Sequence, residues 1–132
     1  MKRVVGIVLI GSALLLILAG CMSLLGLKLS ATVTITRVEE TSIGALKISY
    51  EIRNTGDLEI DYYKIYFTGK LSNGSTMSDW TNGLYVLPGT ARADITYFDT
   101  GGQDVQEVAV RKIILKNYEY DEEISIDIEN PQ

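Results

Sequence analysis

Apolar and polar residues alternate along most of the chain after Ser30, a period of two that is typical of strands with one buried face. In the clearest stretch, LKISYEIRN, apolar side chains occupy every second position: Leu46, Ile48, Tyr50 and Ile52. The same period recurs in TVTIT, in YYKIYF and in EEISIDIE near the C-terminus. This region has no stretch with the spacing of an amphipathic helix, so the alternation predicts an all-β domain.

Turn-forming residues separate the alternating stretches. Asn73-Gly74 predicts a tight primed hairpin turn because both residues tolerate positive φ, while Asn54-Thr55-Gly56-Asp57 and Pro88-Gly89 predict a corner and a turn. The strands are expected at 31–39, 44–54, 58–71, 75–86, 90–98, 105–117 and 122–129. About seven short strands indicate an antiparallel immunoglobulin-like β-sandwich. Within 105–117, Val105, Val108 and Val110 leave open a short helical turn before the strand.

The N-terminus carries a different pattern. Lys2 and Arg3 precede the apolar run VVGIVLIGSALLLIL, and this run leads into Leu18-Ala19-Gly20-Cys21. The order of charge, apolar core and small residues before a cysteine resembles the signal peptide and lipobox of bacterial-type lipoproteins. The resemblance implies a signal peptide over 1–20 and lipid on the sulfur of Cys21. The alternating pattern after Ser30 then predicts a tether over 21–30 and the sandwich over 31–132.

An uncleaved N-terminal anchor helix is the alternative interpretation of the same segment. From Val4 to Leu27 no charged residue occurs, and about 20 apolar residues suffice to cross a bilayer. In either case the positive end stays in the cytoplasm, so the sandwich is expected at the cell membrane on its extracytoplasmic side. Met22 follows Cys21, and the choice between inner and outer membrane stays open.

The composition excludes several chemistries. The chain has no histidine and one cysteine, which excludes Ser-His and Cys-His nucleophiles, an internal disulfide and a cysteine cluster for a metal. Its net charge of -5 disfavours nucleic acid as a partner, since phosphates need a cationic face. We therefore predict no catalytic residues, no metal site and no cofactor, and expect that the protein is not an enzyme.

A second resemblance covers ISYEIRNTGDLEIDYYKIYFTGKLSNG. An alternating strand at Ile48–Ile52, the corner Asn54-Thr55-Gly56, a second strand at Tyr63–Phe67 and the turn Leu87-Pro88-Gly89 are similar to the FxLyD and CARDB groups of cell-surface sandwich domains, and more distantly to a water-stress module. The resemblance implies a non-catalytic binding or spacer module of a surface protein. We expect a binding or accessory role, with an envelope protein or glycan as a possible partner. A structural or stress-protective envelope protein without a specific ligand is the alternative.

Aromatic residues supply the candidate partner surface. Alternation places Tyr63 and Phe67 in the core and leaves Tyr62 and Tyr66 facing outward, where tyrosine and tryptophan suit an interface. Cross-strand pairing on the face of the sheet explains the two outward tyrosines equally well. Trp80 completes the candidate set, although a tryptophan in a sandwich is more often a core residue.

Acidic residues raise a weaker hypothesis. Asp57, Glu59 and Asp61 share one side of an extended segment, and carboxylates of this kind can help to bind calcium. A charged strand edge that prevents aggregation is the favoured explanation, both here and for the acidic run in YDEEISIDIE. Asn73-Gly74-Ser75 also matches the N-glycosylation pattern on an expected exposed turn, and its modification stays open.

Overall fold

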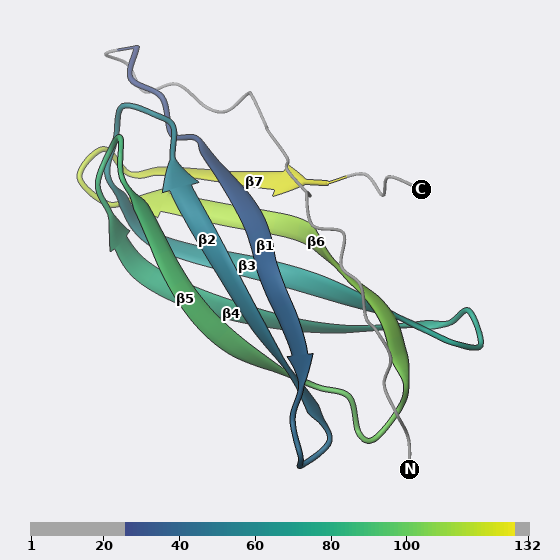
Figure 1. Ribbon diagram of the computed structural model, residues 1–132. Helices are drawn as coiled ribbons and strands as arrows, with labels where there is room; N and C mark the ends of the chain where they lie inside the picture. The colour runs from purple at the N-terminus through teal and green to yellow at the C-terminus, as the bar shows by residue number, and fades with distance from the viewer. Residues whose placement is uncertain (1–25, 129–132) are drawn as a thin grey trace.

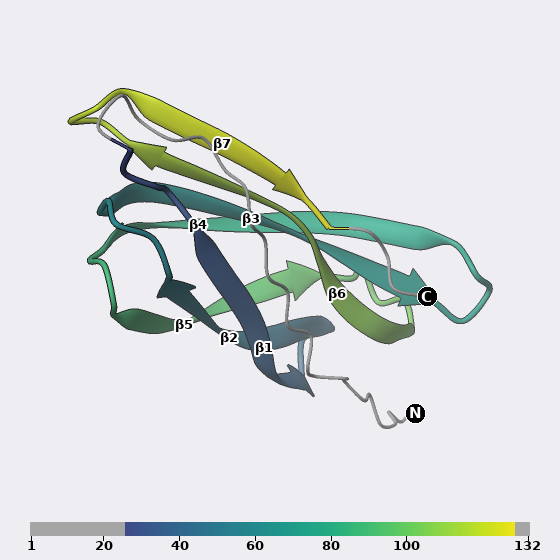
Figure 2. The same ribbon diagram turned by 90° about the horizontal axis from the view of Figure 1, so that it is seen from above.

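The computed structural model describes residues 26–128, which form two packed antiparallel sheets (Figures 1 and 2). One sheet has the order β1-β2-β5 and consists of β1 (Ala31–Glu40), β2 (Ala45–Asn54) and β5 (Ala91–Asp99). The other has the order β4-β3-β6-β7 and consists of β3 (Ile60–Leu71), β4 (Thr76–Val86), β6 (Val105–Asn117) and β7 (Glu122–Asp127). The predicted antiparallel sandwich is confirmed.

The predicted N-terminal segment, including Leu18, Ala19, Gly20 and Cys21, lies outside the described residues. Within 26–128, no helix is long and apolar enough to cross a membrane.

The core lies between the sheets and is built from the apolar positions of the alternating pattern. Tyr63 and Phe67 are completely buried, as alternation predicts, and Tyr50 faces them from β2. The remaining large, fully buried side chains are mostly aliphatic: Leu29, Val33, Ile48, Ile52, Ile60, Ile65, Ile113 and Leu115, together with Phe98. Burying such side chains is the main favourable term in the stability of a domain this size.

The segment 105–117 is strand throughout, so the helical turn considered for its valines is wrong. The pairing of β3 with β6 shifts between Tyr66 and Phe67 and again between Lys70 and Leu71. Each shift is a β-bulge, which adds one residue to β6 and reverses the phase of the alternation. At each bulge, the spacing between inward-facing residues increases from two positions to three. In the sequence, this spacing of the apolar residues resembles that of a helix.

The turn between β3 and β4 differs from the primed turn predicted at Asn73-Gly74. Gly74 has φ of 92°, but Asn73 is absent from the residues with positive φ. The Gly74 amide donates to the Leu71 carbonyl and the Leu71 amide donates to Ser75, which is a three-residue loop. Asn73 accepts hydrogen bonds from the amide and hydroxyl of Ser75 and so stabilises the loop through its side chain.

The corner after β2 is organised by Asn54, a buried polar residue. Its amide nitrogen donates to the carbonyls of Leu58 and Val86, both at 2.8 Å, and its side-chain oxygen accepts from the Gly56 amide at 2.9 Å. The main chain of Asn54 also exchanges hydrogen bonds with the turn that contains Gly89. Asn54 therefore connects the β2–β3 corner with the β4–β5 turn.

The packed region begins earlier than the predicted domain boundary at residue 31. Leu29 is fully buried, and the carbonyl of Lys28 accepts from the amides of Asp57 and Leu58. The Ser30 hydroxyl lies 2.7 Å from the hydroxyl of Thr55. Residues 28–30 are thus part of the sandwich. Contact with the β2–β3 corner buries the apolar Leu29 side chain and gives the backbone of this segment hydrogen-bond partners.

Candidate functional site

The outer face of the four-stranded sheet carries a cluster of aromatic and basic side chains. Tyr62, Lys64 and Tyr66 project from β3 on the side opposite its buried residues. Pairing then adds residues from both neighbouring strands: Trp80 of β4 and Lys112 of β6 lie opposite Tyr66, and Lys116 of β6 lies opposite Tyr62. We call this set, Tyr62, Lys64, Tyr66, Trp80, Lys112 and Lys116, the aromatic–lysine face.

Ammonium groups and aromatic rings alternate across the aromatic–lysine face. The Nζ atom of Lys64 lies 4.2 Å from the ring centroid of Trp80 and 5.0 Å from that of Tyr66. Lys112 Nζ lies 5.5 Å from the Tyr66 centroid, and Lys116 Nζ lies 5.3 Å from the Tyr62 centroid. All four distances are within the range of cation–π attraction, which contributes about 0.5–1 kcal/mol at exposed sites.

Trp80 lies on the surface and not in the core, where a sandwich tryptophan is more often found. It remains 49% exposed, because β4 is the edge strand and position 80 falls on its outer side. The inner side of β4 has little room: a Cβ added to Gly83 would lie 2.3 Å from the Tyr63 hydroxyl. The core is filled from β3, and the tryptophan is left facing outward beside Lys64.

The charge on this surface is arranged in strips. Lys64, Lys112 and Lys116 make the middle of the sheet basic in a chain whose net charge is -5. On the β7 side the surface becomes acidic, since Glu123 lies opposite Lys116 with a 4.0 Å ion pair and Asp127 lies opposite Lys112. An acidic group of a partner would therefore reach the ammonium groups more easily from the β3–β4 side of the sheet than from the β7 side. The exposed aromatic rings lie on that same side.

The chemistry of this face is suited to binding. Ring surfaces stack on flat or apolar groups, while ammonium groups donate hydrogen bonds to carboxylates. The sequence predicted the aromatic members Tyr62, Tyr66 and Trp80, and the structure brings all three onto one face. The candidate set from the sequence left out all three lysines. Lys64 shares the phase of Tyr62 and Tyr66 within β3, whereas only the strand register reveals that Lys112 and Lys116 lie beside the tyrosines.

Two of the acidic residues considered for calcium, Asp57 and Asp61, serve local structure. One carboxylate oxygen of Asp57 accepts from the Lys28 amide at 3.0 Å, and one of Asp61 accepts from the Tyr118 amide at 2.6 Å. Each carboxylate thus fixes a neighbouring loop to the start of β3. No group of three or more potential metal-ligating side chains occurs within the part of the chain that the structure describes.

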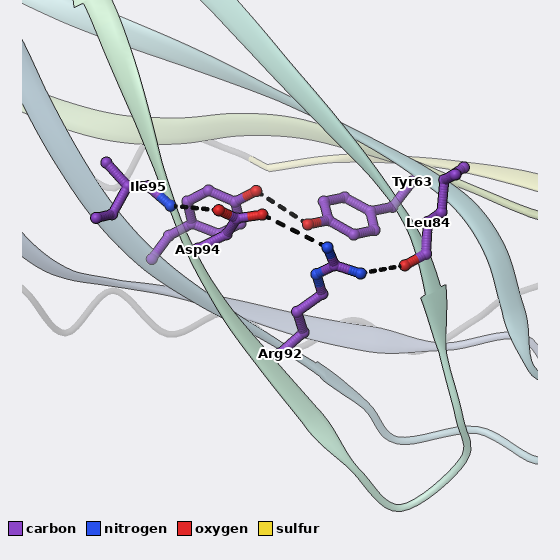
Figure 3. Close-up of polar contacts among 6 residues, drawn as sticks. Tyr63, Leu84, Arg92, Asp94 and Ile95 are labelled. Atoms are coloured by element: carbon purple, nitrogen blue, oxygen red, sulfur yellow. Dashed lines mark hydrogen bonds and ion pairs between the residues drawn. The ribbon is translucent and has the colours of Figure 1, made fainter.

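A buried pair of hydroxyl groups was not predicted from the sequence. Tyr50 and Tyr63 lie on opposite sheets with their oxygens 2.9 Å apart, and their rings meet edge to face (Figure 3). Near them, Arg92 donates to the Leu84 carbonyl and forms an ion pair with Asp94. Burial raises the pKa of both tyrosines, so each hydroxyl stays protonated and acts as a structural group.

The fold defines the chain as an antiparallel β-sandwich protein. No family model matches it, and no curated protein matches it either. The structure is similar to a DUF1425 family member from Shewanella sp. pv-4, with a TM-score of 0.50 and 16% identity, covering 80% of this chain and 94% of that chain. At this identity the similarity supports the fold alone. The predicted resemblance to the FxLyD and CARDB groups is not confirmed.

Two further solved structures show weaker similarity. The trimeric lipoprotein SadB of Salmonella enterica gives a TM-score of 0.44 at 8% identity, covering 67% of this chain and 55% of that chain. DesR, a β-glucosidase from Streptomyces venezuelae, gives a TM-score of 0.45 at 15% identity, covering 76% of this chain and 15% of the glucosidase.

Proposed function

We propose that this protein is a membrane-anchored extracytoplasmic lipoprotein whose sandwich is a non-catalytic binding module. Its partner surface is the aromatic–lysine face. The observation that carries the proposal is the exposed Trp80 ring beside the Lys64 ammonium group, because this pairing offers a partner apolar area and positive charge together. Exposed tryptophan and tyrosine bury much area at little entropic cost, which is why they are frequent at interfaces.

Charge indicates the class of partner. Three lysines line a face of a protein that is acidic in total, so an acidic partner is attracted here and repelled elsewhere. We infer a carboxylate-bearing component of the cell envelope, either a glycan or a protein segment. The lysines hold the charge, and the rings provide the surface on which the rest of the partner packs.

The anchor is assigned from the N-terminal sequence. The lipobox Leu18-Ala19-Gly20 directs cleavage before Cys21, and the sulfur of Cys21 carries the lipid. An uncleaved membrane helix in the same segment is the alternative, and it leaves the sandwich on the same side of the membrane.

The experiment measures how much purified protein binds to isolated cell envelope. It compares the wild type with single-residue variants of either sheet. Lys64→Ala and Trp80→Ala should each reduce the bound fraction several-fold, while Lys47→Ala on the other sheet should leave it unchanged. Raising the salt concentration should weaken wild-type binding, since part of the attraction is between exposed charges. Equal binding by all four proteins would overturn the proposed surface.

A structural envelope protein without a specific ligand is the second candidate. It is favoured by the cation–π contacts themselves, because the lysines already occupy the ring faces within the chain. For such a protein, substitutions in the aromatic–lysine face would lower stability and leave envelope association unchanged.

A further inference from the structure

Three connections between strands lie at the end of the sandwich where the chain enters the domain. β2, β4 and β6 end there, and β3, β5 and β7 begin there. We call this part of the molecule the chain-entry end; it consists of residues 26–30, 55–59, 84–90 and 118–121. Figures 1 and 2 place the loops at 41–44, 72–75 and 100–104 at the opposite end.

The chain-entry end exposes large apolar and aromatic side chains. Tyr85, Leu87 and Tyr118 are 63%, 55% and 64% exposed, and Leu84, near the end of β4, is 45% exposed. Among the residues that the structure describes, the loops of the opposite end have one such side chain, Ile43, and Tyr97 lies two residues before the end of β5. Tyrosine combines an apolar ring with a polar hydroxyl and is enriched where proteins meet the headgroup region of a bilayer.

The backbone at Tyr85 turns its ring outward. Its φ is 59°, a left-handed conformation that is unusual for an aromatic residue. Simple alternation after Gly83 would point position 85 into the sandwich, and the left-handed residue reverses this while Val86 is buried. Such a conformation is unfavourable for a residue with a bulky side chain, so the fold retains an unfavourable residue that exposes a ring at this end.

Charge at the chain-entry end selects the type of lipid. Asp57, Glu119 and Asp121 are exposed here, and Lys28 is the basic residue of the entering segment. This excess of carboxylates disfavours a strongly anionic surface and is compatible with zwitterionic headgroups.

We propose that the chain-entry end rests on the bilayer, with Tyr85, Leu87 and Tyr118 in the zwitterionic headgroup region. The proposal rests on lipidation of Cys21, as proposed above. Only residues 22–26 separate Cys21 from Leu27, which packs against the core. An extended chain spans about 3.3–3.6 Å per residue, so the six steps from Cys21 to Leu27 reach about 22 Å at most. An anchor this short holds the chain-entry end close to the lipid.

The test uses full-length lipidated protein in vesicles of phosphatidylethanolamine and phosphatidylcholine. A fluorophore is attached at Leu87→Cys or Tyr118→Cys, with Ile43→Cys as the matched probe at the opposite end. Cys21 does not react with the dye when its sulfur carries lipid. We expect quenchers on the lipid chains to act several-fold more strongly at positions 87 and 118 than at 43, and aqueous iodide to act in the reverse order.

Other outcomes separate the two proposals. Equal quenching at both ends in protein that stays with the vesicles would overturn the orientation and leave the anchor intact. Probes at 87 and 118 shielded from both quenchers would indicate that a second copy covers this end, which also contradicts the orientation. Wild-type protein that takes up dye at Cys21 and separates from the vesicles would overturn the lipid anchor itself.

Discussion

The hydroxyl oxygens of Tyr50 and Tyr63 lie 2.9 Å apart in the middle of the sandwich, one from each sheet. Both side chains are almost completely buried, so water cannot replace the contact if it is lost. A buried hydroxyl without a hydrogen bond would then destabilise the fold. The pair joins the two layers by a directional contact in a core that is mostly apolar.

Removing one hydroxyl of the pair should destabilise the fold, and the two single variants should differ. Tyr50→Phe leaves the Tyr63 hydroxyl without the contact, at a cost of about 1–3 kcal/mol in the free energy of unfolding. Tyr63→Phe should cost less, because Tyr50 also has a hydrogen bond with Thr81. Urea unfolding of both variants and of the double variant measures the coupling. Strictly additive losses would contradict a direct contact.

Stability should decrease at alkaline pH through the same pair. Burial raises the folded-state pKa of both tyrosines above the usual 10.0. The stabilisation is therefore complete below pH 10, and above it the unfolded chain loses protons that the folded chain keeps. Unfolding free energy should fall by about 1.4 kcal/mol per pH unit for each tyrosine. Urea titrations from pH 9 upward measure the slope, and it should be smaller in the double phenylalanine variant.

Lys64→Met should remove the ammonium group from the Trp80 ring while it keeps most of the apolar stem. The loss in unfolding free energy should be about 0.5–1 kcal/mol. Trp80 is the single tryptophan of the chain, so its fluorescence reports this contact directly. Lys47→Met on the other sheet is the control and should leave the emission spectrum unchanged; a spectrum insensitive to Lys64→Met would contradict the geometry.

Asn54→Ala should be far more damaging than Asn73→Ala. The first substitution leaves two buried carbonyls and the Gly56 amide without the hydrogen bonds of Asn54, each such loss costing about 1–3 kcal/mol. The second removes contacts within an exposed loop, and its effect should stay within about 1 kcal/mol. Thermal unfolding of the two variants provides the comparison, and similar midpoints would refute the role of Asn54.

The strands could be predicted closely from the sequence, because the alternation of apolar and polar residues is regular in β2, β3 and β7. The exceptions are positions where one residue breaks the phase. The bulges in β6 made its valines resemble a helical turn, and the left-handed Tyr85 exposes a ring that alternation would bury. A period carries no information about such local insertions.

The candidate site could be predicted only in part. Tyr62 and Tyr66 follow from the phase of a single strand, whereas the lysines on β6 join them through pairing between segments far apart in sequence. Trp80 faces outward because Tyr63 fills the space at Gly83, a packing relation that the order of residues does not express. Register and packing, and not composition, define the aromatic–lysine face.

We propose that lipid on Cys21 holds the sandwich outside the cell, and the intact mass of the membrane-extracted protein tests this proposal. We predict a chain that begins at Cys21 and carries the added mass of acyl chains, and a Cys21→Ser variant with neither cleavage nor lipid. A mass equal to the unmodified chain from Met1 would show that Cys21 carries no lipid and that the leader is not cleaved.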